Sequence, residues 1–360
     1  MRTRKALAVL LLVAIIIVPG AAAVSSVSSD GAVPFTSYYD QLNANSKAVY
    51  DAIDSAGPDV RNITVPLPIK ITTNSNNPDD AKTYMDNTIR SISDDAFKAL
   101  RISSPMAYWA WIANVVKQPV PTFDKNGALI SLTYNVAIAR LPGDTAGPDV
   151  AKMLSDLAAA VDAFSTNSTT IRDKVLDINN YLIEKVTYDP YYGITEATDG
   201  GGTESVFDHD AYGALVESHH YAVCDGYAKA FLLLCQKEGI DCVVVLGTAV
   251  SSYENHAWNY VKMEDGKWYA IDVTWNDNGK DDNPYFLLGG KTFFTTHSPG
   301  AFLGDGSNAY PFKSPALSPD NYDVYTPTIY DLYGGWIVTG IIIAILCAML
   351  YYHQTKTGKR

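Results

Sequence analysis

Apolar positions predict a mixture of helices and strands in the first half of the chain. They recur at helical spacing in residues 42–53, 148–164 and 171–186, and they alternate with other residues in 65–71 and 130–138. Prolines stand between the alternating positions of 65–71, so we expect that strand at the edge of a sheet. Residues 33–170 are therefore predicted to form a mixed α/β N-terminal region without an internal repeat.

Residues 206–300 show a second pattern, in which one apolar helix is followed by short strands. Residues 223–238 predict a buried helix that Gly239 ends, and Glu264–Gly266 has the composition of a hairpin turn. The other apolar segments predict strands at 242–246, 256–263, 268–275 and 284–288. We expect an α+β domain over residues 171–304, with an antiparallel sheet packed on the helix.

The two ends of the chain carry basic residues beside apolar segments. A basic start, an apolar run and then small residues predict a signal peptide over residues 1–23. Residues 334–352 are nearly all apolar and precede a basic tail at 353–360, a pattern typical of a transmembrane helix and its cytoplasmic tail. Residues 305–333, rich in proline, tyrosine and aspartate, predict a linker before that helix.

The charge distribution fits an exported domain and limits the kinds of partner. The 360 residues hold 27 Lys and Arg against 39 Asp and Glu, a net charge of −12, which argues against a nucleic-acid partner. A hydrophobic content of 47% excludes a disordered chain. Because basic residues beside a span face the cytoplasm, we expect a single-pass protein of the cell membrane whose main domain is extracytoplasmic.

Three side chains have the types and places that nucleophilic catalysis needs. Cys224 begins the predicted buried helix, where the helix dipole favours a thiolate anion. His256 opens one predicted strand and Asp272 lies in the next, which would supply a base and its orienting acceptor. A three-residue loop at Glu264–Gly266 places His256 and Asp272 on one face of the sheet, whereas a two-residue turn places them on opposite faces.

The segments around these three residues resemble the transglutaminase-like superfamily. They are Tyr212–Val216 with Val223–Ala228, then Asn255–Asn259, then Ile271–Trp275. Their order and predicted secondary structure resemble the prokaryotic extracytoplasmic members of the superfamily, papain-like thiol enzymes with a Cys-His-Asp triad. Relatives often carry glycine where this chain has Ala222.

The resemblance implies a role for each of the three residues. Cys224 would be the nucleophile, His256 the base and Asp272 the group that orients the base. The thiolate would attack a carboxamide or peptide carbonyl, and the resulting thioester would pass to water or to an amine. The resemblance implies a protein or peptide substrate, with cell-wall peptides as one candidate, and neither a cofactor nor a metal. His297, after Tyr285–Leu288, resembles the end of the same domain.

Other interpretations stay open at this point. The domain could be a non-catalytic surface binding or adhesion module that keeps the fold, or a sensor whose N-terminal region binds a partner. Cys235 and Cys242 could form a disulfide, although their apolar surroundings favour two core thiols. Asp208, His209 and Asp210 could suggest a metal site, but no second cluster accompanies them.

Overall fold

The computed structural model describes most of the chain between residues 35 and 353. The described residues are 35, 37–56, 62–71, 77–112, 115–116, 118–136, 149–194, 205–280, 282–300, 311–323, 339–340, 342–350 and 352–353. The predicted signal peptide lies outside this set, as do most of the predicted linker and tail. No helix among the described residues is long and apolar enough to cross a membrane, so the transmembrane helix at 334–352 stays a prediction.

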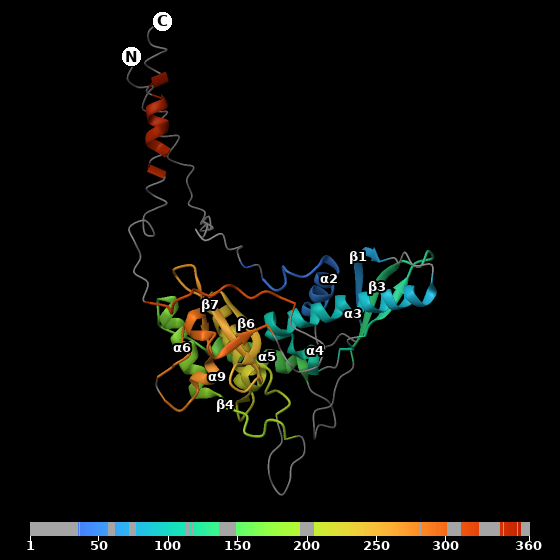
Figure 1. The fold of residues 1–360 in the computed structure, drawn as a ribbon, viewed down its shortest axis with the longest axis horizontal. Coiled ribbons are helices and arrows are strands. Elements are labelled where there is room, and N and C mark those ends of the chain that lie inside the picture. Colours follow the sequence, from blue (N-terminus) through green and yellow to red (C-terminus); the bar gives the residue numbers. More distant parts are fainter. Residues whose placement is uncertain are drawn as a thin grey trace. The chain divides into compact units, whose positions relative to one another are not determined.

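The N-terminal region combines a three-stranded antiparallel sheet with helices (Figure 1). Its strands, in the order β1-β3-β2, are β1 (Asn62–Ile71), β2 (Val120–Phe123) and β3 (Leu129–Asn135). Its helices are α2 (Ala44–Asp54), α3 (Pro78–Ser103), the 3-10 turn η1 (Pro105–Tyr108) and α4 (Trp109–Ile112). The proline-containing β1 lies at the edge, as predicted. One apolar core joins the sheet to α2 and α3 through residues that include Val49, Ile53, Val65, Leu100 and Leu132.

The helix α3 is absent from the sequence predictions, although the sequence carries its start signals. Asn77 accepts a hydrogen bond from the N–H of Asp79, and Pro78 stands at the first helical position. The buried residues of α3 recur every three or four positions, at Met85, Ile89, Ile92, Ala96 and Leu100. Its last turn carries Arg101 to the helix that begins with Cys224.

The second half of the chain packs helices against a four-stranded sheet. The helices are α5 (Val150–Ala163), α6 (Ile171–Lys185), α7 (Ala211–Leu215), α8 (Cys224–Lys237), α9 (Val273–Asn276) and α10 (Gly290–Phe293). The strands, in the order β8-β7-β6-β9, are β6 (Cys242–Ala249), β7 (Asn255–Lys262), β8 (Trp268–Ile271) and β9 (His297–Pro299). A separate parallel pair is formed by β4 (Thr187–Tyr188) and β5 (Tyr221–Ala222). The α8 helix is buried along most of its length, which confirms the predicted α+β class.

The core around α8 draws on residues before and after position 170. Leu157 and Phe164 pack in the same buried cluster as Leu182 of α6, Phe231 of α8 and Val261 of β7. The helix α5 therefore contributes to the core that holds the predicted nucleophile helix.

The N-terminal region packs against α8 and β6 in a second buried cluster. Tyr38 and Ile102 pack in one buried cluster with Leu232 of α8 and Val244 of β6. The Tyr38 hydroxyl also donates to the carbonyl of Val244 at 2.9 Å. The N-terminal region and the domain of α8 thus share buried surface within the described chain.

The register of β7 and β8 is the one that the triad hypothesis needs. Lys262 pairs with Trp268 and Asn259 with Ile271, as expected for a three-residue loop. The prediction that the strand 268–275 continues to Trp275 is wrong, because β8 ends at Ile271. The Asp272 side chain caps α9, and this hydrogen bond replaces the backbone pairing of a strand. The predicted strand at 284–288 is also wrong: the segment makes a single bridge, and β9 takes the fourth place in the sheet.

Both edges of the four-stranded sheet are covered or short. On the outer side of β8, backbone hydrogen bonds to residues outside the sheet cover the edge. They join Trp268 to Ser318, Ala270 to Leu288, and Asp272, just after the strand, to Tyr285. At the other edge, β9 has three residues and ends at Pro299, which has no backbone N–H.

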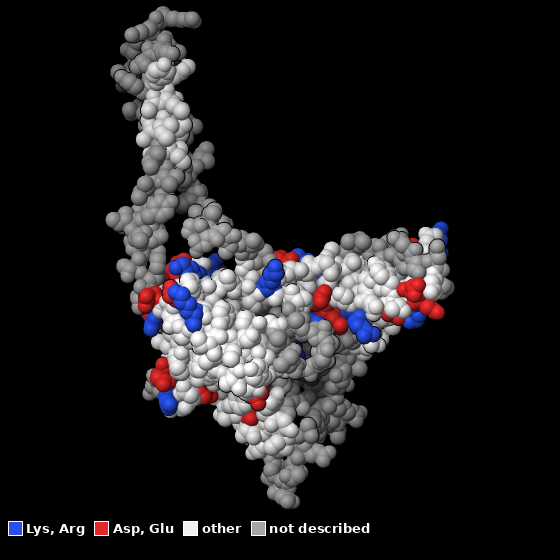
Figure 2. Space-filling view, viewed as in Figure 1, with Lys and Arg blue, Asp and Glu red and all other residues white. Residues whose placement is uncertain are grey.

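Acidic and basic side chains are interspersed on the face of the molecule drawn in Figure 2. A wide part of that face carries neither kind of charge. This face therefore presents no continuous basic surface of the sort that nucleic acids bind.

Candidate active site

Cys224 is the first residue of α8, and its side chain is partly exposed. Val223, before it, makes no side-chain cap, so the N–H groups of the first turn remain available to an anion. Val223 donates its own N–H to the carbonyl of Asp208 at 2.8 Å, and Gly226 packs against that carbonyl. A Cβ at position 226 would lie 2.2 Å from the Asp208 oxygen, so this start of α8 requires glycine.

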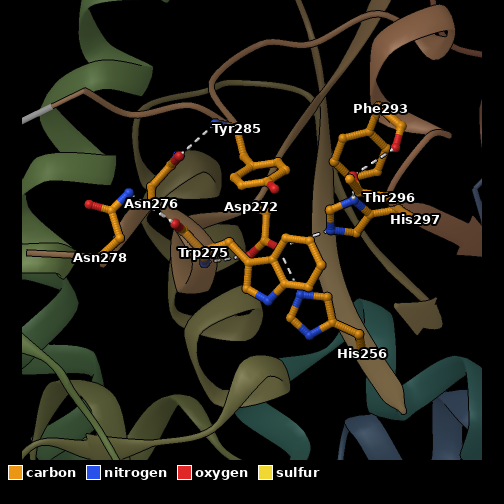
Figure 3. A network of polar contacts seen from close by, with 9 residues as sticks. All are labelled: His256, Asp272, Trp275, Asn276, Asn278, Tyr285, Phe293, Thr296 and His297. Carbon is orange, nitrogen blue, oxygen red and sulfur yellow. Dashed lines mark hydrogen bonds and ion pairs between the residues drawn. The ribbon is translucent and has the colours of Figure 1, made fainter. Parts of the chain in front are cut away.

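His256 is buried near the start of β7 and contacts Asp272 directly (Figure 3). Its Nε2 lies 2.7 Å from Oδ2 of Asp272, and its ring stacks on Trp275 with centroids 4.9 Å apart. Because a carboxylate only accepts hydrogen bonds, Nε2 carries a proton and Nδ1 is the nitrogen left to serve Cys224. The structure therefore brings the predicted base and its orienting group together.

Asn259 links β7, the strand of His256, to α8, the helix of Cys224, by a hydrogen bond. Its side-chain amide is buried and donates to the carbonyl of Ala228 at 3.0 Å. Ala228 lies one helical turn after Cys224. One side chain therefore holds β7 against the first turns of α8.

Asp272 is fully buried and accepts several hydrogen bonds. Its Oδ2 lies 3.0 Å from Nε2 of His297, in addition to His256, and its Oδ1 accepts the N–H of Trp275 at 3.1 Å. Burial acts to raise the pKa of this carboxyl, but the charge and hydrogen bond of His256, then those of His297, lower it to about 2. Asp272 is therefore a carboxylate at neutral pH.

The charge of Asp272 favours a protonated His256. Burial acts to lower the pKa of His256, but the charge and hydrogen bond of Asp272, followed by the neighbouring Cys224, raise it to about 10. An imidazolium beside a cysteine stabilises the thiolate, the form of the side chain that attacks carbonyl groups.

His297 also lies in this site, although the sequence predicts no catalytic role for it. It begins β9, and its ring stacks on Phe293 with centroids 3.9 Å apart. The centroid of its ring lies 4.4 Å from that of Trp275. Burial in this aromatic setting lowers the pKa of His297, in spite of the opposing effect of Asp272. His297 is therefore a neutral imidazole that donates its Nε2–H to Asp272, with the Thr296 hydroxyl 2.8 Å from Nδ1.

Three side chains of the described chain could also hold a metal ion. The ligand atoms of His256, Asp272 and His297 lie within 4.8 Å of one another. Both imidazoles are hydrogen-bonded to Asp272 through these atoms, so an ion would have to replace those bonds. It would also draw His256 away from proton transfer, and we therefore assign the cluster to orienting His256.

Asp225, the residue after Cys224, is the centre of a second buried ionic network. Its carboxylate lies 2.6 Å from Nδ1 of His209, 3.0 Å from the guanidinium of Arg101 and 3.7 Å from Nζ of Lys229. Burial acts to raise the pKa of Asp225, but Lys229, His209 and Arg101 hold it well below its usual range. His209, considered above as a metal ligand, is therefore an ion-pair partner of the residue beside the nucleophile.

The remaining cysteines make no disulfide among the described residues. Cys235 and Cys242 are free thiols, as the apolar surroundings favoured. Burial, and then the neighbouring Cys242, raises the pKa of Cys235, so this thiol stays protonated in the core.

Comparisons with known proteins agree on one family for this region. Residues 156–273, which include Cys224, His256 and Asp272, match the profile of the transglutaminase-like superfamily. The kyphoscoliosis peptidases of Mus musculus and Homo sapiens are 34% and 33% identical to the chain over 94 residues. Each match covers 23% of this chain and 14% of the relative, so this chain spans only a small part of their length.

Two solved structures are similar to the chain at low identity. A crystal structure of a transglutaminase is 16% identical with a TM-score of 0.30, and the match covers 46% of this chain and 45% of that one. A candidate cysteine protease from Cytophaga hutchinsonii is 16% identical with a TM-score of 0.24, and the match covers 43% of this chain and 61% of that one.

Proposed function

Residues 156–273 belong to the transglutaminase-like superfamily, and on this premise we propose that the protein is a thiol enzyme of acyl transfer. Its substrate is an amide or peptide carbonyl of a protein or peptide, with cell-wall peptides as one candidate class. The observation that carries the proposal is the 2.7 Å contact between His256 and Asp272, with Cys224 among the groups that raise the pKa of His256.

The proposed reaction has two steps. The Cys224 thiolate attacks the carbonyl carbon, and the backbone N–H of Cys224 at the start of α8 donates to the developing oxyanion. His256 gives its Nδ1 proton to the leaving amine as the C–N bond breaks, which leaves a thioester on Cys224. In the second step His256 takes a proton from the acceptor, whose oxygen or nitrogen displaces the thiolate.

The acceptor decides the name of the reaction. Water would make the protein a peptidase or amidase, whereas an amine would make it a transamidase. We favour hydrolysis because water is the abundant acceptor.

We further propose that the enzyme acts outside the cytoplasm from a membrane anchor. The support is the sequence of its two ends: the predicted signal peptide at 1–23, the predicted transmembrane helix at 334–352 and the basic tail behind it.

Alkylation of Cys224 in the full chain tests the proposed function. Iodoacetamide is added at pH values from about 5 to 9, and mass spectrometry of peptides measures labelling at each cysteine, with glutathione as the reference thiol. We expect Cys224 to react faster than glutathione at about pH 6, and His256→Ala to slow it by about 10²-fold, because the imidazolium that stabilises the thiolate is lost.

The opposite result would favour another function. If Cys224 reacts no faster than glutathione at acidic pH and His256→Ala changes nothing, the triad is inert. The surface binding or adhesion module would then be the better interpretation of the same fold.

A further inference from the structure

A cavity of about 210 Å³ lies beside the first turns of α8. Its wall includes side chains from α3, from η1, from α8 and from the segment before α7, and its polar members are Arg101, Ser104, Tyr108, His209, Asp210 and Lys229. None of the three triad residues lines it. The volume suits a group of a few heavy atoms.

Two cationic side chains are accessible at this cavity. The side chains of Arg101 and His209 are 32% and 41% exposed, although both also contact Asp225. Lys229 is buried, and its ammonium donates to the carbonyl of His209 at 2.6 Å and to Asp210 at 3.1 Å. Burial acts to lower the pKa of His209, but Asp225 raises it, so His209 tends to carry a positive charge. Arg101 and His209 are therefore the cations that a ligand in the cavity would meet.

We propose that this cavity binds a carboxylate group of the substrate, held by Arg101 and His209. The inference rests on the proposed function, since it makes the cavity a specificity subsite for the acyl substrate. The planar guanidinium of Arg101 matches a carboxylate in shape and charge.

The cavity lies within reach of the proposed reaction centre. Asp225 follows Cys224 in the chain and lies 3.0 Å from Nη2 of Arg101, which puts that atom within roughly 11 Å of the Cα of Cys224. About three residues of extended peptide cover that distance. A substrate could therefore place a carboxylate in the cavity while its carbonyl lies at Cys224.

The test measures binding without turnover, in the full chain carrying Cys224→Ser. Calorimetric titration compares three probes: N-acetylglycine, which represents a chain terminus; N-acetylaspartic acid α-methylamide, which represents an acidic side chain; and the neutral N-acetylglycine methylamide. We expect at least one acid to bind with a dissociation constant of about 1 mM, and the neutral amide to bind at least about tenfold more weakly. The tighter acid identifies the source of the carboxylate.

Two variants in the same background locate the binding site. Arg101→Gln should weaken the binding of the acid by about fivefold or more, whereas Arg90→Gln, exposed on the same helix, should leave it unchanged.

Equal binding of acids and amide, no binding of either acid, or binding that Arg101→Gln does not weaken would overturn the inference. Because Cys224→Ser cannot form a thioester, this result is independent of the alkylation experiment. A failure of the subsite and a failure of the proposed function are therefore distinguishable.

Discussion

One carboxylate oxygen distinguishes the two imidazoles of the candidate site. Oδ2 of Asp272 accepts from both His256 and His297, yet the pKa of His256 is raised and that of His297 is lowered. Burial against Phe293 disfavours a charge on His297, and the charge of His256 repels a second one. His256 is thus suited to proton transfer, while His297 holds Asp272 in place.

Replacing the shared acceptor should disable the site. In Asp272→Asn the amide group brings a donor to a place where two imidazole N–H groups already point. We expect the rate of Cys224 alkylation at about pH 6 to fall by about 10²- to 10⁴-fold, and the free energy of unfolding to fall by about 2 kcal/mol or more. The matched variant Asp282→Asn, at an exposed position, should change neither. Unchanged alkylation in Asp272→Asn would contradict the assigned role.

The raised pKa of His256 should make stability depend on pH on the alkaline side. A histidine in the unfolded chain titrates near about 6.5, whereas His256 in the fold keeps its proton to about pH 10. The contribution of His256 to the free energy of unfolding is complete below about pH 6.5 and is lost as the pH rises towards 10. Between these two pH values, urea unfolding should show that the free energy of unfolding falls by at least about 1 kcal/mol more in wild type than in His256→Gln. Equal losses would show that the imidazolium does not stabilise the fold.

The contact of His297 with Asp272 is beyond what the sequence pattern can predict. Residue 256 lies in β7 and residue 272 directly follows β8, and a short turn joins these strands, so their register indicates that the two residues meet. His297 reaches Asp272 only because β9 pairs with β6, through a long connection that no local periodicity encodes. The contact of His256 with Asp272 is therefore local enough to predict from the sequence, whereas that of His297 depends on tertiary packing.

At the scale of elements, the candidate site depends on how tightly the start of α8 is held. The carbonyl of Asp208 accepts the N–H of Val223 and occupies the space where a Cβ of residue 226 would lie. Asn259 adds a hydrogen bond from β7 to the carbonyl of Ala228. Since Cys224 lies within these contacts, a small shift of the helix start would move its thiol relative to His256.

Gly226→Ala tests this dependence on close packing. The new Cβ would lie 2.2 Å from the Asp208 oxygen, so we expect a loss of about 1–3 kcal/mol in stability together with slower Cys224 alkylation. In the control Gly279→Ala, where a Cβ meets nothing within 4 Å, only the left-handed backbone costs about 1 kcal/mol, and alkylation should be unchanged. If both variants alkylate at the wild-type rate, the packing of Gly226 does not position the nucleophile.

The strand predictions show what limits sequence analysis at this scale. The apolar run Trp268–Ile271 forms a strand as expected, but the similar residues that follow turn into α9. The decisive contact is the hydrogen bond that the N–H of Trp275 donates to the Asp272 side chain, which hydrophobic periodicity does not report. Hydrogen bonds of this kind recur at helix starts, as Asn77 of α3 also shows.

At the scale of the whole molecule, the N-terminal region supports the candidate site. Tyr38 and Ile102 cover part of α8 and β6, and Arg101 binds the carboxylate next to Cys224. An N-terminal region joined in this way is part of the environment of the nucleophile helix, and we expect the two to unfold together.

Ile102→Asp tests whether the described chain is one cooperative unit. Wild type should unfold in one calorimetric transition, because Ile102 is 3% exposed and packs against Leu232 and Val244. An unpaired carboxylate there should cost about 3 kcal/mol or more and separate the transition into two. The control Val120→Asp, at a side chain that is 54% exposed, should keep a single transition. Two transitions in wild type would refute the prediction.

The covered edge of the four-stranded sheet constrains how a substrate can approach. Enzymes that cleave peptides often seat the chain as an added strand on an open sheet edge. Here the outward backbone groups along β8 already pair with residues 285, 288 and 318, and β9 is short and ends in proline. A peptide substrate of the proposed enzyme would therefore gain little from strand addition at this sheet, and we expect selectivity to follow the side chains and termini near the scissile bond more than the extended conformation of the chain.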